Sequence, residues 1–522
     1  MRIKVILILG ISLGIGEIAS AQSNVDDLIR YSGMQYQGTA RATGAGNAFG
    51  AVGADFGAIG INPAGLGLYQ GSEFSATLGF NSASTNGNYL SNNTSDNYFN
   101  PFIGNAGIVI ANNKVKKGKD VSSGWLAVNW AIGYTRTNNF NSNTLIQGTN
   151  TNNSILTSYK EDANNQKTNP YGLGYGTYGG LAYATYLIDP YLNNPNNPYD
   201  SSNYVDRTRL DNSINVSQKD VIQTTGSTSN ISLSVAGNYI GKLYLGATVN
   251  VPTVNFTSNK TFTEYNNNPS SGVDGQYISS SLNESLTTTG VGINVALGGI
   301  YKFNDMFRIG LSLQVPTIYS LTDVFSTTMI GNTAQAQPGE QYNGDVSVTA
   351  SNPTGFQYTI VTPARATLSA AIFFAKNGFL SADYEYCDYS QARLNNSNGN
   401  NYSDINQSVQ QTLQGVNTVR VGCEYRIDAF ALRAGYNYIS TPYKSGLTDA
   451  NFGDTYNILS FGVGFRAKRM GLDLTYQVVT NYSTYTPYTI SSPADIAQYS
   501  TAPSANITTT KGNLMLTYST RF

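Results

Sequence analysis

The feature that most constrains this chain is an alternation of apolar residues with polar or small ones, which recurs along most of its length. After Glu73 the alternation forms segments of about 8 to 10 residues. Because successive side chains of a strand point to opposite faces, such segments are predicted to be β-strands with one apolar face. The clearest segments are EFSATLGF, WLAVNWAIGY, ISLSVAGNYI, KLYLGATVNV, GINVALGGIYKF, RIGLSLQV, ATLSAAIFF, FLSADYEY, TVRVGCEYRI, ALRAGYNYI, LSFGVGFRA, LDLTYQVV and NLMLTYSTRF.

The length and spacing of these segments favour an all-β transmembrane antiparallel barrel. A tilted strand needs about 9 to 11 residues to cross a bilayer. Tight turns are expected near 303–306 and 467–471, and long polar loops alternate with them, which is typical of outer-membrane barrels. A soluble β-sandwich is the alternative, but it rarely has this many strands in one domain or loops this long. The long loops are expected at about 138–225, 256–285, 325–358 and 479–508.

Charged residues fall on one face only in the segments 379–387, 418–427 and 430–438. A charge that faces lipid at the bilayer midplane costs about 2 to 4 kcal/mol, so this face is predicted to point into the lumen. One interpretation is a polar conduit or a surface on which a plug docks. The other, which we favour for any single residue, is neutralisation of charge between neighbouring strands. The predicted lumen wall consists of Asp383, Glu385, Arg420, Glu424, Arg426 and Arg433.

The same alternation separates the two cysteines. Cys387 falls on the lumen face and Cys423 on the lipid face. A disulfide needs Cβ atoms about 3.5 to 4.5 Å apart. No disulfide is therefore predicted, even in an oxidising compartment.

Composition excludes several classes of function. The chain has 0 His, so it lacks His-based acid–base catalysis, nucleophilic triads and the commonest transition-metal ligand. Two Cys cannot form a metal-binding cluster. No catalytic, metal or cofactor-binding residue is predicted and the chain is not expected to be an enzyme, although a carboxylate-only enzyme or a calcium site stays open. The balance of 30 Lys+Arg against 31 Asp+Glu argues against nucleic acid as a partner.

The first 21 residues are predicted to be a signal peptide. Arg2 and Lys4 are basic, residues 5–16 are apolar, and Ala19-Ser20-Ala21 gives a small-x-small cleavage pattern. A buried N-terminal helix is the alternative. The mature chain would then start at Gln22, with no lipoprotein cysteine at that point.

Residues 38–68 read GTARATGAGNAFGAVGADFGAIGINPAGLGL, which is rich in small residues and poor in charge. The run Ala40–Phe49, Asp55 and the element Asn62-Pro63-Ala64 resemble the N-terminal plug of the FadL family, which transports long-chain fatty acids and other hydrophobic compounds across outer membranes. Three later stretches look like the later strands of these barrels: PAR followed by FLSADYEYCDYSQARL, then LRAGYNYISTPY and FGVGFRAKRMGLDLTYQ. The resemblance runs from Gly38 to Phe522. The alternating strand that stops at Phe522 also resembles the assembly signal of outer-membrane barrels.

The resemblance implies a barrel of about 14 strands, which the segments above reach with one more strand at 106–112. It implies a plug at 22–70 inside a barrel at 71–522 with long extracellular loops, and Asn62, Pro63 and Ala64 as the gate. The implied surroundings are outer-membrane lipid and lipopolysaccharide. A hydrophobic ligand would be caught outside and released after a plug rearrangement or through a gap in the wall. The long loop at 138–225 departs from a typical member.

Two alternatives stay open. Val251-Pro252-Thr253 and Val315-Pro316-Thr317 mark either an opening in the wall or ordinary strand ends, because proline removes a ladder hydrogen bond. The second function considered is a FadL-like scaffold or partner subunit in an outer-membrane secretion or assembly complex. Gln22 and the Asn/Tyr-rich loops resemble sequences of Bacteroidetes, in which such barrels serve secretion systems. A barrel hydrolase is disfavoured because such enzymes rely on His.

Overall fold

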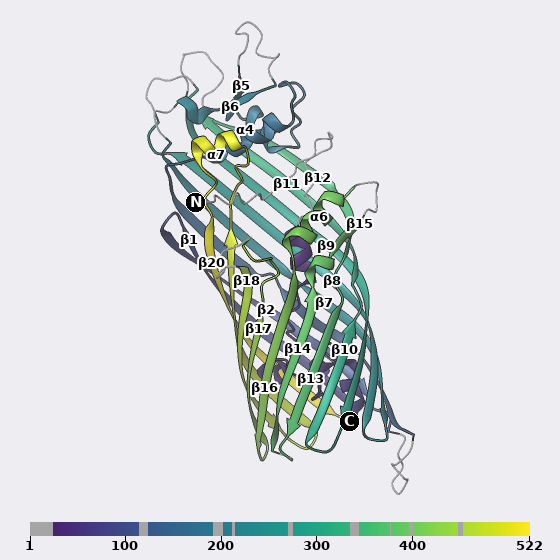
Figure 1. Ribbon diagram of the computed structural model, residues 1–522. Coiled ribbons are helices and arrows are strands. Elements are labelled where there is room, and N and C mark those ends of the chain that lie inside the picture. The colour runs from purple at the N-terminus through teal and green to yellow at the C-terminus, as the bar shows by residue number, and fades with distance from the viewer. Residues whose placement is uncertain are drawn as a thin grey trace.

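The strands close into an antiparallel barrel of 14 strands, in which the last strand pairs with the first (Figure 1). The computed structural model describes residues 25–113, 124–191, 202–210, 214–269, 275–334, 344–375, 377–395, 401–446 and 453–522. The predicted all-β barrel and its strand number are thus confirmed. Each predicted segment, and the stretch 106–112, lies in a different strand of the wall. The predicted signal peptide lies outside the described residues.

The wall follows the order of the chain, and two of its strands are each interrupted once. Its strands are β1 (Glu73–Tyr89), β2 (Asn92–Ile110), β3 (Trp125–Asn139), β7 (Val216–Tyr239), β8 (Leu243–Asn266), β9 (Tyr277–Lys302), β10 (Phe307–Gln314) continued by β11 (Ile318–Thr333), β12 (Gly344–Val361) continued by β13 (Arg365–Phe373), β14 (Gly378–Asp388), β16 (Gly415–Ile427), β17 (Phe430–Ile439), β18 (Gly453–Arg466), β19 (Met470–Tyr485) and β20 (Ala505–Arg521). Short strands β4 (Ser142–Asn150) and β15 (Arg393–Asn395) pair with β7 and β12, while β5 (Ile188–Pro190) and β6 (Tyr204–Asp206) pair with each other.

Helices lie inside the barrel and at its long-loop end. They are α1 (Val25–Ser32), α2 (Ala40–Gly44), α3 (Phe56–Ile59), η1 (Pro63–Leu68), α4 (Ile155–Asn165), α5 (Tyr178–Ala184), η3 (Arg207–Leu210), η4 (Tyr389–Gln391), α6 (Ser403–Thr412) and α7 (Pro493–Tyr499). None of the described helices has the length and hydropathy to cross a membrane.

The strands are much longer than the predicted 8 to 10 residues. β8 has 24 residues and β9 has 26. Large parts of the stretches predicted as loops, such as 256–266, 277–285 and 325–333, belong to strands. The prediction was wrong because it followed apolar residues. Beyond the apolar belt the strands continue with Thr, Ser and Asn, which pair equally well, and Thr favours the extended backbone.

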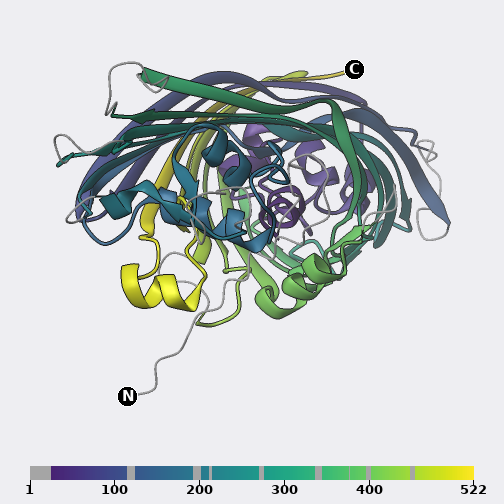
Figure 2. The same cartoon turned by 90° about the horizontal axis from the view of Figure 1, so that it is seen from above.

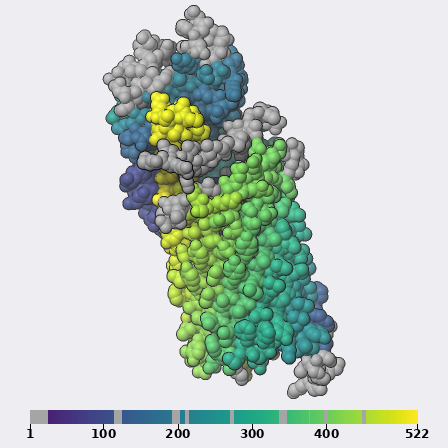
Figure 3. All heavy atoms as spheres, in the orientation of Figure 1, coloured from purple at the N-terminus to yellow at the C-terminus, as the bar shows by residue number. Residues whose placement is uncertain are grey.

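An apolar belt covers the outer surface of the wall. In β14, Leu380 and Tyr384 are exposed, whereas the intervening Ser381 and Asp383 are buried. Cys387 is buried and Cys423 is exposed, and both are free thiols, which confirms the predicted facing of β14 and β16. An apolar outer belt on a closed barrel is stable in hydrocarbon, since the backbone has no unpaired edge there. Figure 3 shows the wall as a continuous column with the long-loop region at one end.

The N-terminal segment, residues 25–72, runs inside the ring of strands (Figure 2). Helix α2 packs against β17, β18, β19 and β20, while η1 packs on the opposite side against β3, β7, β8 and β9. Polar side chains start three of its turns. Thr39, Asp55 and Asn62 each accept a backbone N–H two or three residues later. The segment is therefore folded by local caps and held by both sides of the barrel.

Leu297→Arg should lower the free energy of unfolding by about 2 to 4 kcal/mol, because it places a charge in hydrocarbon. Leu297 is 52% exposed on the outer face of β9. Ser285→Arg, on the same face of β9 but beyond the belt, should change that free energy by less than about 0.5 kcal/mol. Urea unfolding in lipid vesicles measures both, and equal losses would contradict the assigned belt.

Candidate functional site

Asn62 joins the bend of the N-terminal segment to the wall. Its Nδ2 donates to the carbonyl of Gly50 (2.7 Å) and to that of Gly299 in β9 (3.2 Å). Its Oδ1 accepts the N–H of Ala64 (3.0 Å), and Pro63 occupies the first position of η1, where no donor is needed. The side chain is buried, and its bonds to Gly50 and Ala64 are shielded from water. The predicted gate residues thus lie together where the segment meets β9.

Glycines of the wall make this close approach possible. A Cβ atom on Gly298 would lie 2.0 Å from Asn62 Oδ1, and one on Gly246 would lie 2.5 Å from the carbonyl of Pro63. A Cβ atom on Gly310 would lie 2.4 Å from the carbonyl oxygen of Gly50. Sequence reasoning missed these three positions. Their signal was present, since a glycine within a strand pattern often marks close backbone approach.

Gly298→Ala should displace Asn62 and lower the free energy of unfolding by about 1 to 3 kcal/mol, the range for overpacking. Gly299→Ala is the matched control, because its Cβ atom would meet only Leu245 Cδ2 at 3.7 Å. It should leave stability nearly unchanged. Thermal unfolding of both variants tests this, and equal destabilisation would show that Asn62 does not set the packing at β9.

The predicted lumen-wall charges form two clusters. Glu385 binds Arg365 (2.6 Å) and Arg420 (2.8 Å), and Glu424 binds Arg426 (2.6 Å) and Arg433 (2.7 Å). Neighbouring strands therefore neutralise one another. Arg426 differs from the other predicted residues because half of its side chain is exposed at the short-turn rim. Among the described residues, no group of three or more His, Cys, Asp or Glu side chains is placed to hold a metal ion.

Two of these wall residues also contact the N-terminal segment. Asp383 accepts the N–H of Gly50 (3.1 Å), and Glu424 binds Arg41 (3.1 Å). The sequence did not reveal Arg41 as a partner, nor Asp473, which binds Arg433 (2.8 Å). The lumen-facing position of Asp473 could have been predicted, because Asp473 lies between Leu472 and Leu474 on β19 and the leucines face the lipid.

Backbone pairing in the wall is interrupted between β2 and β3. The two strands pair only between 105–110 and 130–135, and beyond this the outer part of β2 pairs with β1 alone. The next residues of β3 bond instead to the N-terminal segment. Gln35 N–H donates to the carbonyl of Thr137 (2.7 Å) and Gln37 N–H to that of Arg136 (3.0 Å).

The two proline elements mark smaller interruptions. Strand β8 continues through Pro252, although residues 251–252 lack partners in β9. Residues 315–317 separate β10 from β11, and Val315 N–H still donates to the carbonyl of Val295 (2.9 Å). Both sites are therefore local breaks within continuous strands, and the longer interruption lies at β3.

Helix α1 fills an apolar part of the lumen on the long-loop side of the β3 interruption. Leu28 and Tyr31 are buried, and the Tyr31 ring packs edge-on against Phe140 and Phe256. Arg30 lies over the Phe256 ring at 4.3 Å. The segment thus occupies space that is lined with aromatic side chains.

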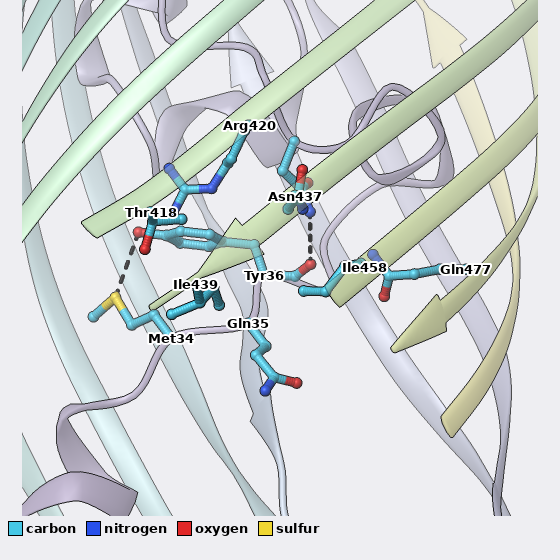
Figure 4. A pocket seen from close by; sticks show the side chains of 10 residues that line it. Met34, Gln35, Tyr36, Thr418, Arg420, Asn437, Ile439, Ile458 and Gln477 are labelled. Atoms are coloured by element: carbon cyan, nitrogen blue, oxygen red, sulfur yellow. Dashed lines mark hydrogen bonds between the residues drawn. The ribbon is translucent and has the colours of Figure 1, made fainter. Parts of the chain in front are cut away.

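Below α1 the segment meets β16 and β17 with little free volume. A pocket between them, lined by Tyr36, Arg420 and Asn437 among others, has about 10 Å³ of accessible volume (Figure 4). Asn47 Nδ2 donates to the carbonyl of Tyr36 (3.0 Å) at its edge. This volume holds about one water molecule, so the segment closes this part of the lumen.

Two cations near the β3 interruption share one neutral partner. Arg136 donates to Asn139 Oδ1 (3.1 Å), and Lys511 donates to the carbonyl of Asn139 (2.9 Å). Arg136 also lies over the Phe102 ring at 4.9 Å. Among the ion pairs of the described residues, neither cation has a carboxylate partner.

Within the stretch 138–225, expected to be a long loop, the described residues between β3 and β7 form much of a folded cap at the long-loop end. Its helix α4 begins beside Glu264, which accepts the Ile155 N–H (3.1 Å) and a bond from Gln218 (2.7 Å). Burial raises the pKa of Glu264 above its usual value. Burial also raises the pKa of Asp220 to about 6, although Lys260 lies 4.0 Å away. The cap is thus fixed to β7 and β8 by buried polar groups.

No family model and no curated protein matches this sequence. Solved structures match over nearly the whole chain. A FadL homologue from Pseudomonas aeruginosa has a TM-score of 0.50 at 13% identity and covers 94% of this chain and 100% of its own. A deletion mutant of the monoaromatic hydrocarbon channel TodX has a TM-score of 0.50 at 12% identity and covers 93% and 99%. At such identities the likeness concerns the fold, and the predicted resemblance to FadL-type barrels is confirmed at that level.

Proposed function

We propose that this protein passes hydrophobic small molecules across the outer membrane through a barrel that its N-terminal segment plugs and gates. The observation that carries the proposal is the position of the segment, which lies inside the ring of strands and packs against strands on both sides. An apolar belt around the barrel supports a place in the outer membrane, among its lipid and lipopolysaccharide. The solved structures of the same fold are named as a FadL homologue and a monoaromatic hydrocarbon channel, which is compatible with a non-enzyme.

The interruption at β3 supports a route through the wall. Gln35 and Gln37 of the segment take the place that β2 would have beside Arg136 and Thr137. A shift of the plug would therefore free the backbone of β3 at the point where the wall lacks its own hydrogen bonds. A shift of the segment and exposure of the β3 backbone are coupled in this arrangement, because both break the bonds of Gln35 and Gln37.

Removal of residues 25–70 should leave a folded barrel, since the wall hydrogen bonds close among the strands. It should make vesicles or cells leaky to small polar solutes. Asn62→Ala should impair uptake of a hydrophobic ligand, because the bend loses its bonds to Gly50 and Gly299. The heat stability of the barrel should change little, since the wall strands keep their pairing. Antibiotic sensitivity and labelled-ligand uptake measure the two effects.

Three outcomes decide between the functions considered. A deleted barrel that inserts correctly yet is no leakier than wild type contradicts gating. If Asn62→Ala abolishes insertion while uptake per inserted barrel is unchanged, Asn62 is structural and a scaffold in a secretion or assembly complex gains support. Stoichiometric partners in the purified protein, without a lipid in the lumen, would favour that scaffold as well.

The cation pair supports a ligand with a carboxylate head and an apolar tail, such as a long-chain fatty acid. Arg136 and Lys511 lack a carboxylate within the chain's described part, and Phe102 lies beside Arg136. Lys511→Met should reduce fatty-acid uptake by about 10- to 100-fold, the effect of one charge-assisted hydrogen bond. Uptake of the fatty alcohol of equal chain length should change little. Equal loss for acid and alcohol would show that Lys511 does not select the head group.

A further inference from the structure

One ion pair joins the described part of the N-terminal segment to a wall strand. Among the ion pairs of the described residues, only Arg41 Nε to Glu424 Oε2 (3.1 Å) links the segment to a wall strand. The Glu424 side chain is fully buried and that of Arg41 is 12% exposed. Such a buried pair normally resists separation, because breaking it leaves an uncompensated charge in a poorly hydrated place.

On the segment side, Arg41 has partners that would move with it. Its NH1 lies 3.6 Å from Asp55 Oδ2 and donates to the carbonyl of Ala54 (3.0 Å). Its guanidinium lies over the Phe49 ring at 5.1 Å. Asp55 is held in turn by Thr39 and by the N–H of Gly57 (2.9 Å). The segment therefore carries its own counter-charge for Arg41.

On the wall side, Glu424 has partners that would stay behind. Arg433 Nε binds it at 2.7 Å and Arg426 at 2.6 Å. Arg433 also binds Asp473 (2.8 Å), which binds Arg466 (2.8 Å). The carboxylates of the wall are therefore compensated without Arg41.

We propose that Arg41 and Glu424 are the positioning residues of the gate, a latch that can part without leaving an isolated charge on either surface. This inference rests on the proposed gating function and adds the residues that set its closed position. The neighbouring contacts of α2 are neutral. Ala40 N–H donates to Thr517 (2.7 Å), and Thr475 donates to the carbonyl of Ala40 (2.6 Å). Water can replace such bonds when the segment shifts, so the ion pair is the contact that holds and aligns α2.

Glu424→Gln should increase passage of a small polar solute per inserted barrel by about 10- to 100-fold, the range for loss of one charge-assisted hydrogen bond. Asp473→Asn is the matched control. Each substitution neutralises a buried carboxylate bonded to Arg433 and to one arginine of the rim, but only Glu424 touches the segment. Asp473→Asn should therefore leak like wild type. The assay is solute efflux from vesicles that contain the full-length protein, with heat-modifiable electrophoresis to count folded barrels.

The segment side supplies a second variant. Arg41→Gln should leak like Glu424→Gln, and Arg41→Lys, which keeps the charge, should restore most of the barrier. Equal leak from Glu424→Gln and Asp473→Asn, or no leak from either, overturns the latch. Failure of both Glu424→Gln and Arg41→Gln to insert also overturns it, since the pair would then be needed for folding. If the barrel without residues 25–70 leaks while these variants do not, the latch is wrong and the plug remains; if that barrel does not leak, gating itself fails.

Discussion

Backbone hydrogen bonding in hydrocarbon is the constraint on which the rest of this structure depends. The lipid core offers no partner to an N–H or C=O group, so every strand inside the belt needs a neighbour on each side. Pairing of β20 with β1 supplies the last neighbours and closes the wall. Closure then fixes the alternation of side chains, with one set facing lipid and the other facing the lumen. The lumen can hold charges only because the strands have turned them away from the lipid.

A wall that is complete by itself leaves the N-terminal segment with a different role. The segment adds no strand to the ladder except beside β3, where Gln35 and Gln37 stand in for β2. It is held instead by caps, by close contacts at glycines and by a few polar bonds. These contacts are weaker individually than a strand pairing, which involves many residues in register. A segment held in this way can shift without unpairing the wall strands from one another.

The sequence predicted the features that follow from alternation and missed those that follow from tertiary contact. The thirteen alternating segments and the facing of Cys387 and Cys423 were correct because both depend on a period of two. The total of 14 strands was implied by the resemblance to FadL-type barrels. Strand length was wrong because the hydrophobic signal stops at the edge of the belt while the hydrogen bonds continue. The placement of Arg426 at the rim depends on where the turn after β16 begins, at Asp428, which alternation does not show. Pairing of Arg41 with Glu424 could not be predicted, because no periodicity relates a segment of short helices to the register of a wall strand.

The distribution of charge across the interface suits a part that moves. Two charged wall residues meet the segment through its backbone: Asp383 at the Gly50 N–H and Arg308 at the carbonyl of Val52. A backbone group that leaves such a contact carries no net charge with it. Glu385 forms no ion pair with the segment, because both of its arginine partners belong to the wall. A wall and an N-terminal segment that each carry counter-charges for their own ions can separate without leaving an isolated charge, whereas an ion pair without such partners would hold them together.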